Sequence, residues 1–450
     1  MYLSLLSRLL NIYFSGALMS SHKWHWLHNP ITGGVLLVIA ATIALFWANL
    51  APDHYHHFWH NTLWEVSTGL SDKVHQINLH KVANEFLMAI FFFFIGLEIK
   101  RELLDGELSS FQKAALPLFA ALGGVIFPAG IYYLFNAGLD SVNGWGIPMA
   151  TDIAFALGVL AIVGSRVPVA LKVFLSALAI GDDLMAVVVI AVFYTEQIFV
   201  NELMYGIVGI LLLALANRLG VRNNLFYYIV GLSIVWISFL ASGVHATVAG
   251  VAVAFTIPSR REISMTSYLD QTKALLKGLE TDRHCEEDVL SRHAIKSLKK
   301  INILSYQASN PLQLKEEALH PLATLIIVPF FALGNAGVII DASMLEQLTN
   351  PIVLGIAAGL IVGKPLGIFL FTKLLILLKL GALPKGVTWT HVIGAGFLAG
   401  IGFTMSLFIT DLAFSNPEHQ IIAKVAVFVA SLLSGIIGYI ILIGAKPETE

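Results

Sequence analysis

Four ionisable residues stand in stretches of the sequence that are otherwise apolar. Asp152 lies in MATDIAFALG, Asp182 and Asp183 lie in ALAIGDDLMAV, and Lys364 lies in GLIVGKPLGIF. Each charge near the centre of a bilayer costs about 2.5–3.5 kcal/mol on insertion scales, so these groups must be paired, hydrated or protonated for part of the time. A static salt bridge would pair the lysine with one acid and leave two carboxylates for a cation or for protons.

The chemistry open to these aspartates is competition between a cation and protons. Carboxylate, hydroxyl and main-chain carbonyl oxygens are the ligands that a hard cation such as sodium prefers. Burial and a nearby like charge both favour the protonated carboxyl, so protons compete for the same site. Adjacent helical residues point about 100° apart, so one of Asp182 and Asp183 is free to join Asp152 while the other meets Lys364. Such competition is the minimum chemistry of an antiporter.

The composition places these residues in a membrane protein. The chain has 450 residues, of which 57% are hydrophobic and 12% are charged, whereas about 25% of a soluble domain is charged. The net charge of −2 gives no reason to expect nucleic acid as a partner. The single cysteine, Cys285, excludes a disulfide within the chain.

Twelve apolar segments are candidates for membrane spans, since a bilayer core about 30 Å thick needs about 20 apolar residues per helix. The segments cover residues 31–50, 83–99, 114–135, 147–164, 172–194, 203–217, 225–242, 245–257, 319–338, 351–372, 389–410 and 420–444. Lys and Arg concentrate in cytoplasmic loops. With the N-terminus inside, Lys73, Lys81 and Lys424 are the exceptions to that rule. The pattern predicts a multi-pass protein with both termini in the cytoplasm.

The rest of the chain divides into three parts. Residues 1–30 predict a cytoplasmic, interfacial segment, because Arg8 interrupts the apolar stretch that a cleavable signal needs. The membrane domain covers 31–444 and is interrupted by a charged cytoplasmic insertion at 258–318, either regulatory or inert; residues 445–450 form a cytoplasmic tail.

The first external loop is rich in histidine. It runs from about residue 51 to 82 and contains His54, His56, His57, His60, His75 and His80. The spacing repeats no known ligand pattern, so we interpret the loop as solvated and not as a metal site.

Glycines in the eleventh segment point to a break in that helix. The stretch GAGFLAGIGFTMSLF includes Gly400 and Gly402, followed by Thr404 and Ser406. Clustered glycines permit close helix packing. They also permit an interrupted helix whose freed carbonyls and helix ends serve ions, as in transporters with discontinuous helices.

These motifs together resemble the NhaA family of sodium/proton antiporters. The resemblance extends from about residue 31 to 444 and includes FFFFIGLEIKREL, ATDIAFALGVLAIVGSRVP, ALAIGDDL, SGVHATVAG, ALGNAGV, VGKPLG and GIGFTMSLFI, in the family's order. It implies an all-α polytopic fold of about 12 helices with inverted repeats, in which the fourth and eleventh helices are discontinuous and cross at mid-membrane.

The resemblance also assigns roles at the centre of the membrane. It implies that Asp152 and Asp183 bind sodium and protons, and that Asp182 is the partner of Lys364. Thr151 would supply an oxygen or cap a half-helix. The sequence departs from the family's usual pattern beside the aspartate pair, at Gly181 and Met185, where affinity or pH threshold would change.

Candidates for a pH response lie nearer the membrane surfaces. The second segment ends with Glu98, Lys100, Arg101 and Glu102. The family resemblance implies that these residues sense pH or attract cations. Ordinary anchoring of basic residues on the cytoplasmic side explains the two basic residues equally well. His245 begins the eighth segment, and a histidine titrates near neutrality. The alternative for His245 is a merely interfacial position.

The function implied is electrogenic, pH-regulated exchange of sodium, and of lithium, for protons across a bacterial inner membrane. The proton gradient would expel sodium by alternating access, without a cofactor, and the resemblance implies a homodimer joined partly through the first external loop. Two other functions use similar residues. An intramembrane aspartyl protease needs a GxGD signature, which fails at Ala179, whereas a passive cation channel differs only in lacking coupled proton movement.

Overall fold

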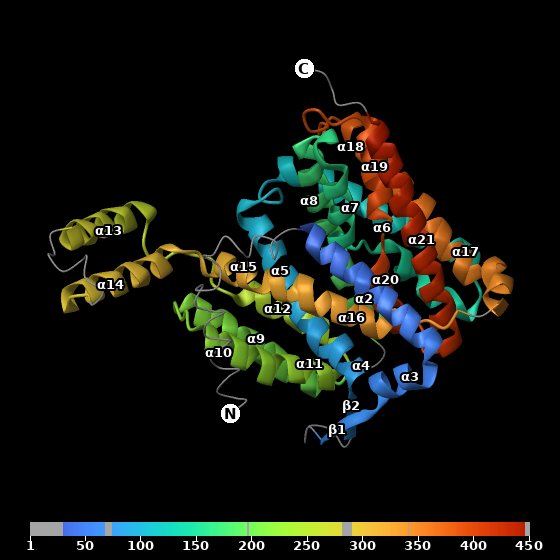
Figure 1. Cartoon of the computed structure of the whole chain (residues 1–450), viewed down its shortest axis with the longest axis horizontal. Coiled ribbons are helices and arrows are strands. Elements are labelled where there is room, and N and C mark those ends of the chain that lie inside the picture. Colours follow the sequence, from blue (N-terminus) through green and yellow to red (C-terminus); the bar gives the residue numbers. More distant parts are fainter. Residues whose placement is uncertain (1–29, 68–73, 196–197, 281–289, 341, 446–450) are drawn as a thin grey trace.

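The computed structural model describes residues 30–67, 74–195, 198–280, 290–340 and 342–445. The predicted interfacial segment, apart from Pro30, lies outside the described residues, as do Cys285 and residues 446–450 of the predicted tail. The described chain is almost entirely helical (Figure 1).

Nine helices in the described ranges are long and apolar enough to cross a membrane. Five are single helices: α2 (Pro30–Leu50), α6 (Phe111–Asn136), α8 (Val169–Phe193), α9 (Val200–Arg218) and α21 (Pro417–Gly444). Four contain a wider, π-helical turn: α4 (Leu79–Lys81) with η2 (Val82–Leu87) and α5 (Met88–Asp105); α10 (Asn224–Val230) with η5 (Gly231–Trp236) and α11 (Ile237–Ser242); α15 (Pro311–Leu322) with η6 (Ala323–Ile327) and α16 (Val328–Asn335); and α17 (Pro351–Ala358) with η8 (Gly359–Gly363) and α18 (Lys364–Leu377).

The fourth and eleventh predicted spans are both broken. In the fourth, η3 (Asp140–Met149) is followed by α7 (Ile153–Val163) and the turn η4 (Gly164–Arg166), with a bend of 40°. In the eleventh, α19 (Trp389–Ala399) and α20 (Phe403–Ala413) are bent by 47°. The eighth is the shorter apolar helix α12 (Ala246–Thr256). All twelve predicted segments therefore correspond to helices, and the prediction of two discontinuous helices is confirmed.

Contacts among six spans follow a repeated pattern. The third span packs on the fourth and fifth, as the tenth packs on the eleventh and twelfth; the fourth packs on the fifth as the eleventh packs on the twelfth. The cross-contacts also correspond, because α8 meets α19 and α21 meets α7, while α6 lies along α18. This correspondence is what an inverted repeat of spans three to five and ten to twelve requires. We call these six spans the repeat bundle.

The other six spans form a second bundle, here called the wall bundle. Within it α5 packs on α12 and α15, α9 packs on α11 and α12, and α2 packs on α16. Figure 1 shows α9 to α12 on one side of the molecule and α18, α19 and α21 on the other. The two bundles meet mainly where α2 lies against α7.

Several described helices lie outside the predicted spans. In the predicted insertion, α13 (Met265–Glu280) and α14 (Arg292–Ala308) pack on each other and stand away from the body in Figure 1. The ninth span begins at Pro311 and not at 319, because its first two turns are too polar for an apolar window to include. A short turn of helix, η7 (Ala342–Thr349), precedes α17.

The described residues of the loop between the first two spans form a short helix and a hairpin. These are α3 (Pro52–His60) and an antiparallel hairpin of β1 (Thr62–Ser67) and β2 (Val74–Asn78). The rings of His56 and His60 stack at 4.5 Å, and burial lowers the pKa of His60. Among the residues described, no group of three or more His, Cys, Asp or Glu side chains could hold a metal ion.

The contact between α6 and α18 generates a prediction about stability. A Cβ at Gly123 would clash with the carbonyl of Gly367, and one at Gly367 with the carbonyl of Gly123. We expect Gly123→Ala to destabilise the protein by about 1–3 kcal/mol, because two backbones would have to move apart. Gly130→Ala is the matched control, since a Cβ at Gly130 on the same helix meets nothing within 4 Å. Thermal unfolding in detergent should show a lower midpoint for the first variant only.

Candidate ion-binding site

The breaks in the fourth and eleventh spans meet and bond to each other. The main-chain N–H of Asp152 donates to the carbonyl of Ile401 at 2.7 Å, and the Thr151 hydroxyl donates to the carbonyl of Ala399 at 2.7 Å. From the other chain segment, the Ser406 hydroxyl donates to the carbonyl of Ile147 at 2.7 Å. Backbone groups freed by the breaks thus find partners away from lipid, which non-helical backbone at this depth requires.

Gly400 and Gly402 permit close packing around the break in the eleventh span. A Cβ at Gly400 would clash with the Leu360 carbonyl and the Ser434 hydroxyl, and one at Gly402 would clash with the Ser406 hydroxyl. The two interpretations of these glycines therefore both apply, since the helix is interrupted and is also closely packed. Ser406 has a structural hydrogen bond at the crossing, whereas Thr404 reaches the aspartate.

Asp152 sits between the N-termini of two half-helices. It caps α7, where one carboxylate oxygen accepts from the N–H of Phe155 at 3.0 Å. The other oxygen accepts from the hydroxyl and the N–H of Thr404, in the first turn of α20, at 2.6 and 3.2 Å. Helix N-termini carry partial positive charge and unpaired N–H groups, so both half-helices stabilise a negative charge at Asp152. The side chain is nevertheless buried, with 2% of its surface exposed.

Asp183 lines the same cavity as Asp152, and one of its carboxylate oxygens has no hydrogen-bond donor in the described structure. The cavity has a volume of about 130 Å³ and is lined by both aspartates together with Thr151, Thr404 and Met405. Asp183 is equally buried, and its Oδ1 accepts no hydrogen bond from any residue in the described part of the chain. A buried carboxylate oxygen without a donor calls for a proton or a cation. The cavity has room for a cation with a few water molecules.

Asp182 and Lys364 form a buried ion pair beside this cavity. Their Nζ and Oδ2 atoms lie 2.6 Å apart, and both side chains are fully buried. Lys364 also donates to the carbonyl of Met149, at the C-terminal end of η3. Because that end of a helix carries partial negative charge, the lysine balances both the aspartate and the broken helix. The two adjacent aspartates thus divide as helical spacing allows, one toward Lys364 and one toward Asp152.

The residues at the C-terminal end of α5 separate into two groups. Glu98 lines the same cavity as the two aspartates. Arg101 instead donates to both carboxylate oxygens of Glu316 on α15 at 2.8 Å, and to Glu102 at 2.6 Å. Lys100 donates to two carbonyls at the C-terminal end of α12, at 2.7 and 2.5 Å. Only Glu98 of this group therefore touches the site directly.

His245 lies apart from the aspartates. It caps α12, and its Nδ1 is 2.8 Å from the Thr247 hydroxyl. The ring packs edge-on against Phe408 at 5.2 Å. The residues that line the cavity do not include His245. Phe408 on α20 is one contact that connects this histidine with the half-helix bonded to Asp152.

Sequence reasoning missed part of the cavity wall. His320 and Thr324 from the ninth span line it. The signal was weak, because EALHPLATL lies at the start of an apolar segment and a lone histidine there is unremarkable without its spatial neighbours.

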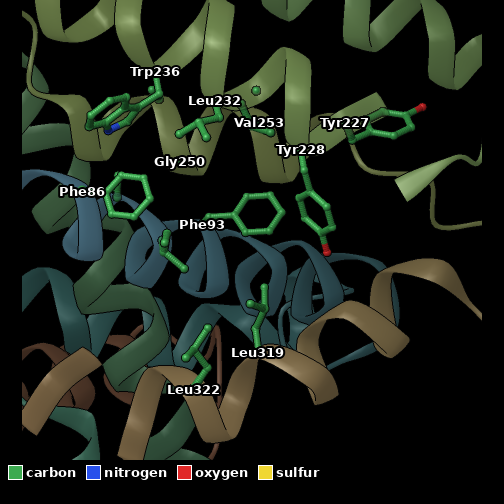
Figure 2. Close-up of a pocket in the computed structure, with 14 residues that line it drawn as sticks. Phe86, Phe93, Tyr227, Tyr228, Leu232, Trp236, Gly250, Val253, Leu319 and Leu322 are labelled. Atoms are coloured by element: carbon green, nitrogen blue, oxygen red, sulfur yellow. The ribbon is translucent and has the colours of Figure 1, made fainter. Parts of the chain in front are cut away.

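A second cavity, of about 260 Å³, contains no ionisable lining residue other than tyrosine. It lies between α5, η5, α12 and α15, and Figure 2 shows Phe86, Phe93, Tyr228 and Trp236 around it. Its walls supply no carboxylate for a cation. Of these two cavities, only the smaller one, with the two aspartates, offers carboxylates to a cation.

The buried pair of Asp182 and Lys364 predicts a compensation experiment. Lys364→Met should destabilise the protein by about 3–5 kcal/mol, because it leaves Asp182 charged and unpaired in a buried position. Adding Asp182→Asn should restore a large part of that loss. Thermal unfolding of the single and double variants measures the difference. Equal unfolding midpoints for the single and the double variant would show that the loss does not come from an unpaired charge on Asp182.

Comparisons with known proteins agree with this geometry. A family model described as Na+/H+ antiporter 1 matches residues 25–442. Na(+)/H(+) antiporter NhaA 1 of Psychromonas ingrahamii is 74% identical over 428 residues, which are 95% of this chain and 98% of the relative. Na(+)/H(+) antiporter NhaA of Wolinella succinogenes is 45% identical over 92% of this chain and 91% of its own length.

A remote structural likeness is to the sodium proton antiporter MjNhaP1 from Methanocaldococcus jannaschii at pH 8. It covers 98% of this chain and 100% of that one, with a TM-score of 0.46 and 14% identity. The family assignment comes from the sequence comparisons, which extend over nearly the whole chain. The chain therefore belongs to the Na+/H+ antiporter 1 family, as a member of its NhaA group.

Proposed function

We propose that this protein exchanges sodium for protons at a site made by Asp152 and Asp183. The observation that carries the proposal is the shared cavity, in which Asp183 has an unbonded carboxylate oxygen and Asp152 faces two half-helix N-termini. Family membership supports the reaction, since the relatives are named as Na(+)/H(+) antiporters. The protein is thus a secondary transporter and not an enzyme.

The two aspartates have different environments and different tasks. Asp152 is already stabilised by three donors, so its carboxylate depends less strongly on the bound cation or proton. Asp183 is less satisfied, so it depends more strongly on the incoming cation or proton. The Thr404 hydroxyl and the carbonyls near the breaks are oxygen ligands within reach of a small rearrangement. Lithium, a smaller hard cation, fits the same oxygen set.

The described arrangement favours access from the cytoplasm. The cavity includes Glu98, near the cytoplasmic end of α5. On the external side, Phe408 of α20 packs against Phe92 and Phe331 at ring distances of 5.7 and 6.1 Å. We therefore propose a cycle in which the site meets sodium from the cytoplasm, closes there, and opens externally to release sodium and take up protons.

We propose a bacterial inner-membrane location with both termini cytoplasmic, and a domain at 31–444 that the 258–318 insertion interrupts. The excess of Lys and Arg on one side supports this orientation. We further propose a homodimer joined through the external hairpin, where Leu63 and Trp64 are 43% and 65% exposed. Regulation by pH would act through Glu98, which touches the site, and through the Arg101–Glu316 pair between α5 and α15.

The first test of the proposal measures sodium-driven proton movement in proteoliposomes. Asp152→Asn and Asp183→Asn should each reduce it to the level of protein-free vesicles, because an amide cannot carry the exchanged proton or the anionic charge. Asp140→Asn is the matched control, since Asp140 is an exposed carboxylate on the same broken span. A sodium leak without coupled proton movement would instead support the passive channel.

The second test counts the competing protons. Where the site is mostly protonated, lowering the pH by one unit should raise the apparent KM for sodium about tenfold if one proton competes, and about a hundredfold if two do. We expect the steeper dependence and electrogenic exchange, because two carboxylates face one monovalent cation. Uptake of radioactive sodium with the membrane potential clamped measures both quantities. An apparent KM independent of pH would contradict competition at the aspartates.

A further inference from the structure

A polar cluster joins four spans at the external ends of the helices. We call it the external cluster: Asp411 of α20, Lys424 of α21, His80 of α4, Asn84 of η2 and Asn335 of α16. Lys424 Nζ lies 2.7 Å from the Asp411 carboxylate, and Asn84 Nδ2 donates to the same carboxylate at 3.0 Å. His80 Nε2 lies 3.1 Å from the Asn335 amide oxygen and 3.9 Å from Asp411.

The burial of these residues distinguishes the cluster from ordinary surface polarity. The side chains of Asp411 and Lys424 are each only 12% exposed, and Asn335 is 2% exposed. Surface ion pairs are worth little, but a buried charge is held only with good partners. Lys424 is also an exception to the rule that basic residues stay on the cytoplasmic side. Its position near the outside is explained by Asp411.

The members of the cluster come from both bundles. Asp411 and Lys424 belong to the repeat bundle, whereas His80, Asn84 and Asn335 belong to the wall bundle. Within the described residues of the cluster, the contacts across the boundary are one hydrogen bond, from Asn84 to Asp411, and the longer approach of His80 to Asp411.

Each half of the cluster keeps internal partners if the two halves separate. Asp411 retains its ion pair with Lys424. Asn84 and Asn335 retain the hydrogen bonds between their amides, at 2.8 and 3.3 Å, and His80 retains its contact with Asn335. No charge is left buried without a partner, which is the large penalty in breaking most buried ion pairs. This arrangement is better suited to a contact that forms and breaks reversibly than to a permanent contact between the bundles.

The cluster is connected to the ion site through one half-helix. Asp411 lies seven residues after Thr404 on α20, which is about two helical turns, so the two side chains share a face. Between them, Phe408 packs into the wall bundle against Phe92 and Phe331. The half-helix that binds Asp152 thus also carries an aromatic barrier and the external cluster.

We propose that the external cluster is a latch that holds the outer route closed while the ion site is open to the cytoplasm. Asp411 is its positioning residue: it holds α20 against α16 and η2 and thereby keeps Phe408 in place. Release of sodium to the outside requires the Asn84–Asp411 contact to break. The latch builds on the proposed exchange, because it describes how that site is closed on one side.

Reversible cross-linking across and within the bundles tests the latch. Cys285→Ser removes the native thiol, and Asn84→Cys with Asp411→Cys places two thiols across the boundary. A short, reducible, thiol-specific cross-linker should lower sodium/proton exchange in proteoliposomes at least tenfold, and reductant should restore it. Asn84→Cys with Asn335→Cys is the matched control, because that pair lies within the wall bundle. Its exchange should change less than twofold on cross-linking.

Three outcomes of the cross-linking experiment would contradict the latch, and one would contradict the proposed function. Undiminished exchange by the cross-linked Asn84/Asp411 pair would overturn the latch, as would failure of that pair to cross-link. Equal losses in both cross-linked pairs would show a general need for flexibility and would also overturn it. Absence of exchange by the reduced wild-type protein would contradict the proposed function and not the latch.

Hydrogen exchange provides a measurement that does not depend on transport. Asp411→Asn, compared with Asp140→Asn, should speed amide exchange at least threefold in peptides covering residues 403–413 and 79–87. Unchanged exchange in those peptides would mean that Asp411 does not hold the two bundles together, and the latch would be wrong.

Discussion

The structure depends on stabilising a buried carboxylate without neutralising it permanently. At Asp152 this is done by the N-termini of α7 and α20, which direct N–H groups and a hydroxyl at the two oxygens. Two continuous helices crossing at this depth would present only side chains to the aspartate. The breaks are therefore conditions for the arrangement around Asp152 and not local irregularities. The short half-helices follow from the same requirement.

Charge compensation at the other ends of the broken helices is as important. The C-terminal end of η3 directs its carbonyls inward, and Lys364 meets one of them while pairing with Asp182. Together, the positive helix ends face Asp152 and the negative end faces Lys364. Asp182 pairs with Lys364 through one oxygen, whereas no basic side chain pairs with Asp183 in the described structure, where its Oδ1 accepts no hydrogen bond.

Local sequence patterns were enough for the spans and for the prediction that the adjacent aspartates point apart, because both depend only on near neighbours along the chain. The assignment of Asp182 to Lys364 came from the family resemblance. Contacts between distant spans left weaker signals. Asp411 falls one residue beyond the predicted eleventh segment, and Lys424 stood out only as an exception in the charge count. Neither residue indicates the other until α20 and α21 are placed together.

The distribution of the site between the two bundles bears on how it changes access. Asp152, Asp182, Asp183, Lys364 and Thr404 all belong to the repeat bundle. The wall bundle contributes only boundaries, with Glu98 at the inner end of the cavity and Phe92 beside the outer barrier. In the proposed cycle, a movement of one bundle against the other would exchange the walls and keep the candidate ligands and the buried ion pair within one bundle. The contacts that change would then be those between the bundles, of which the Asn84–Asp411 hydrogen bond is one.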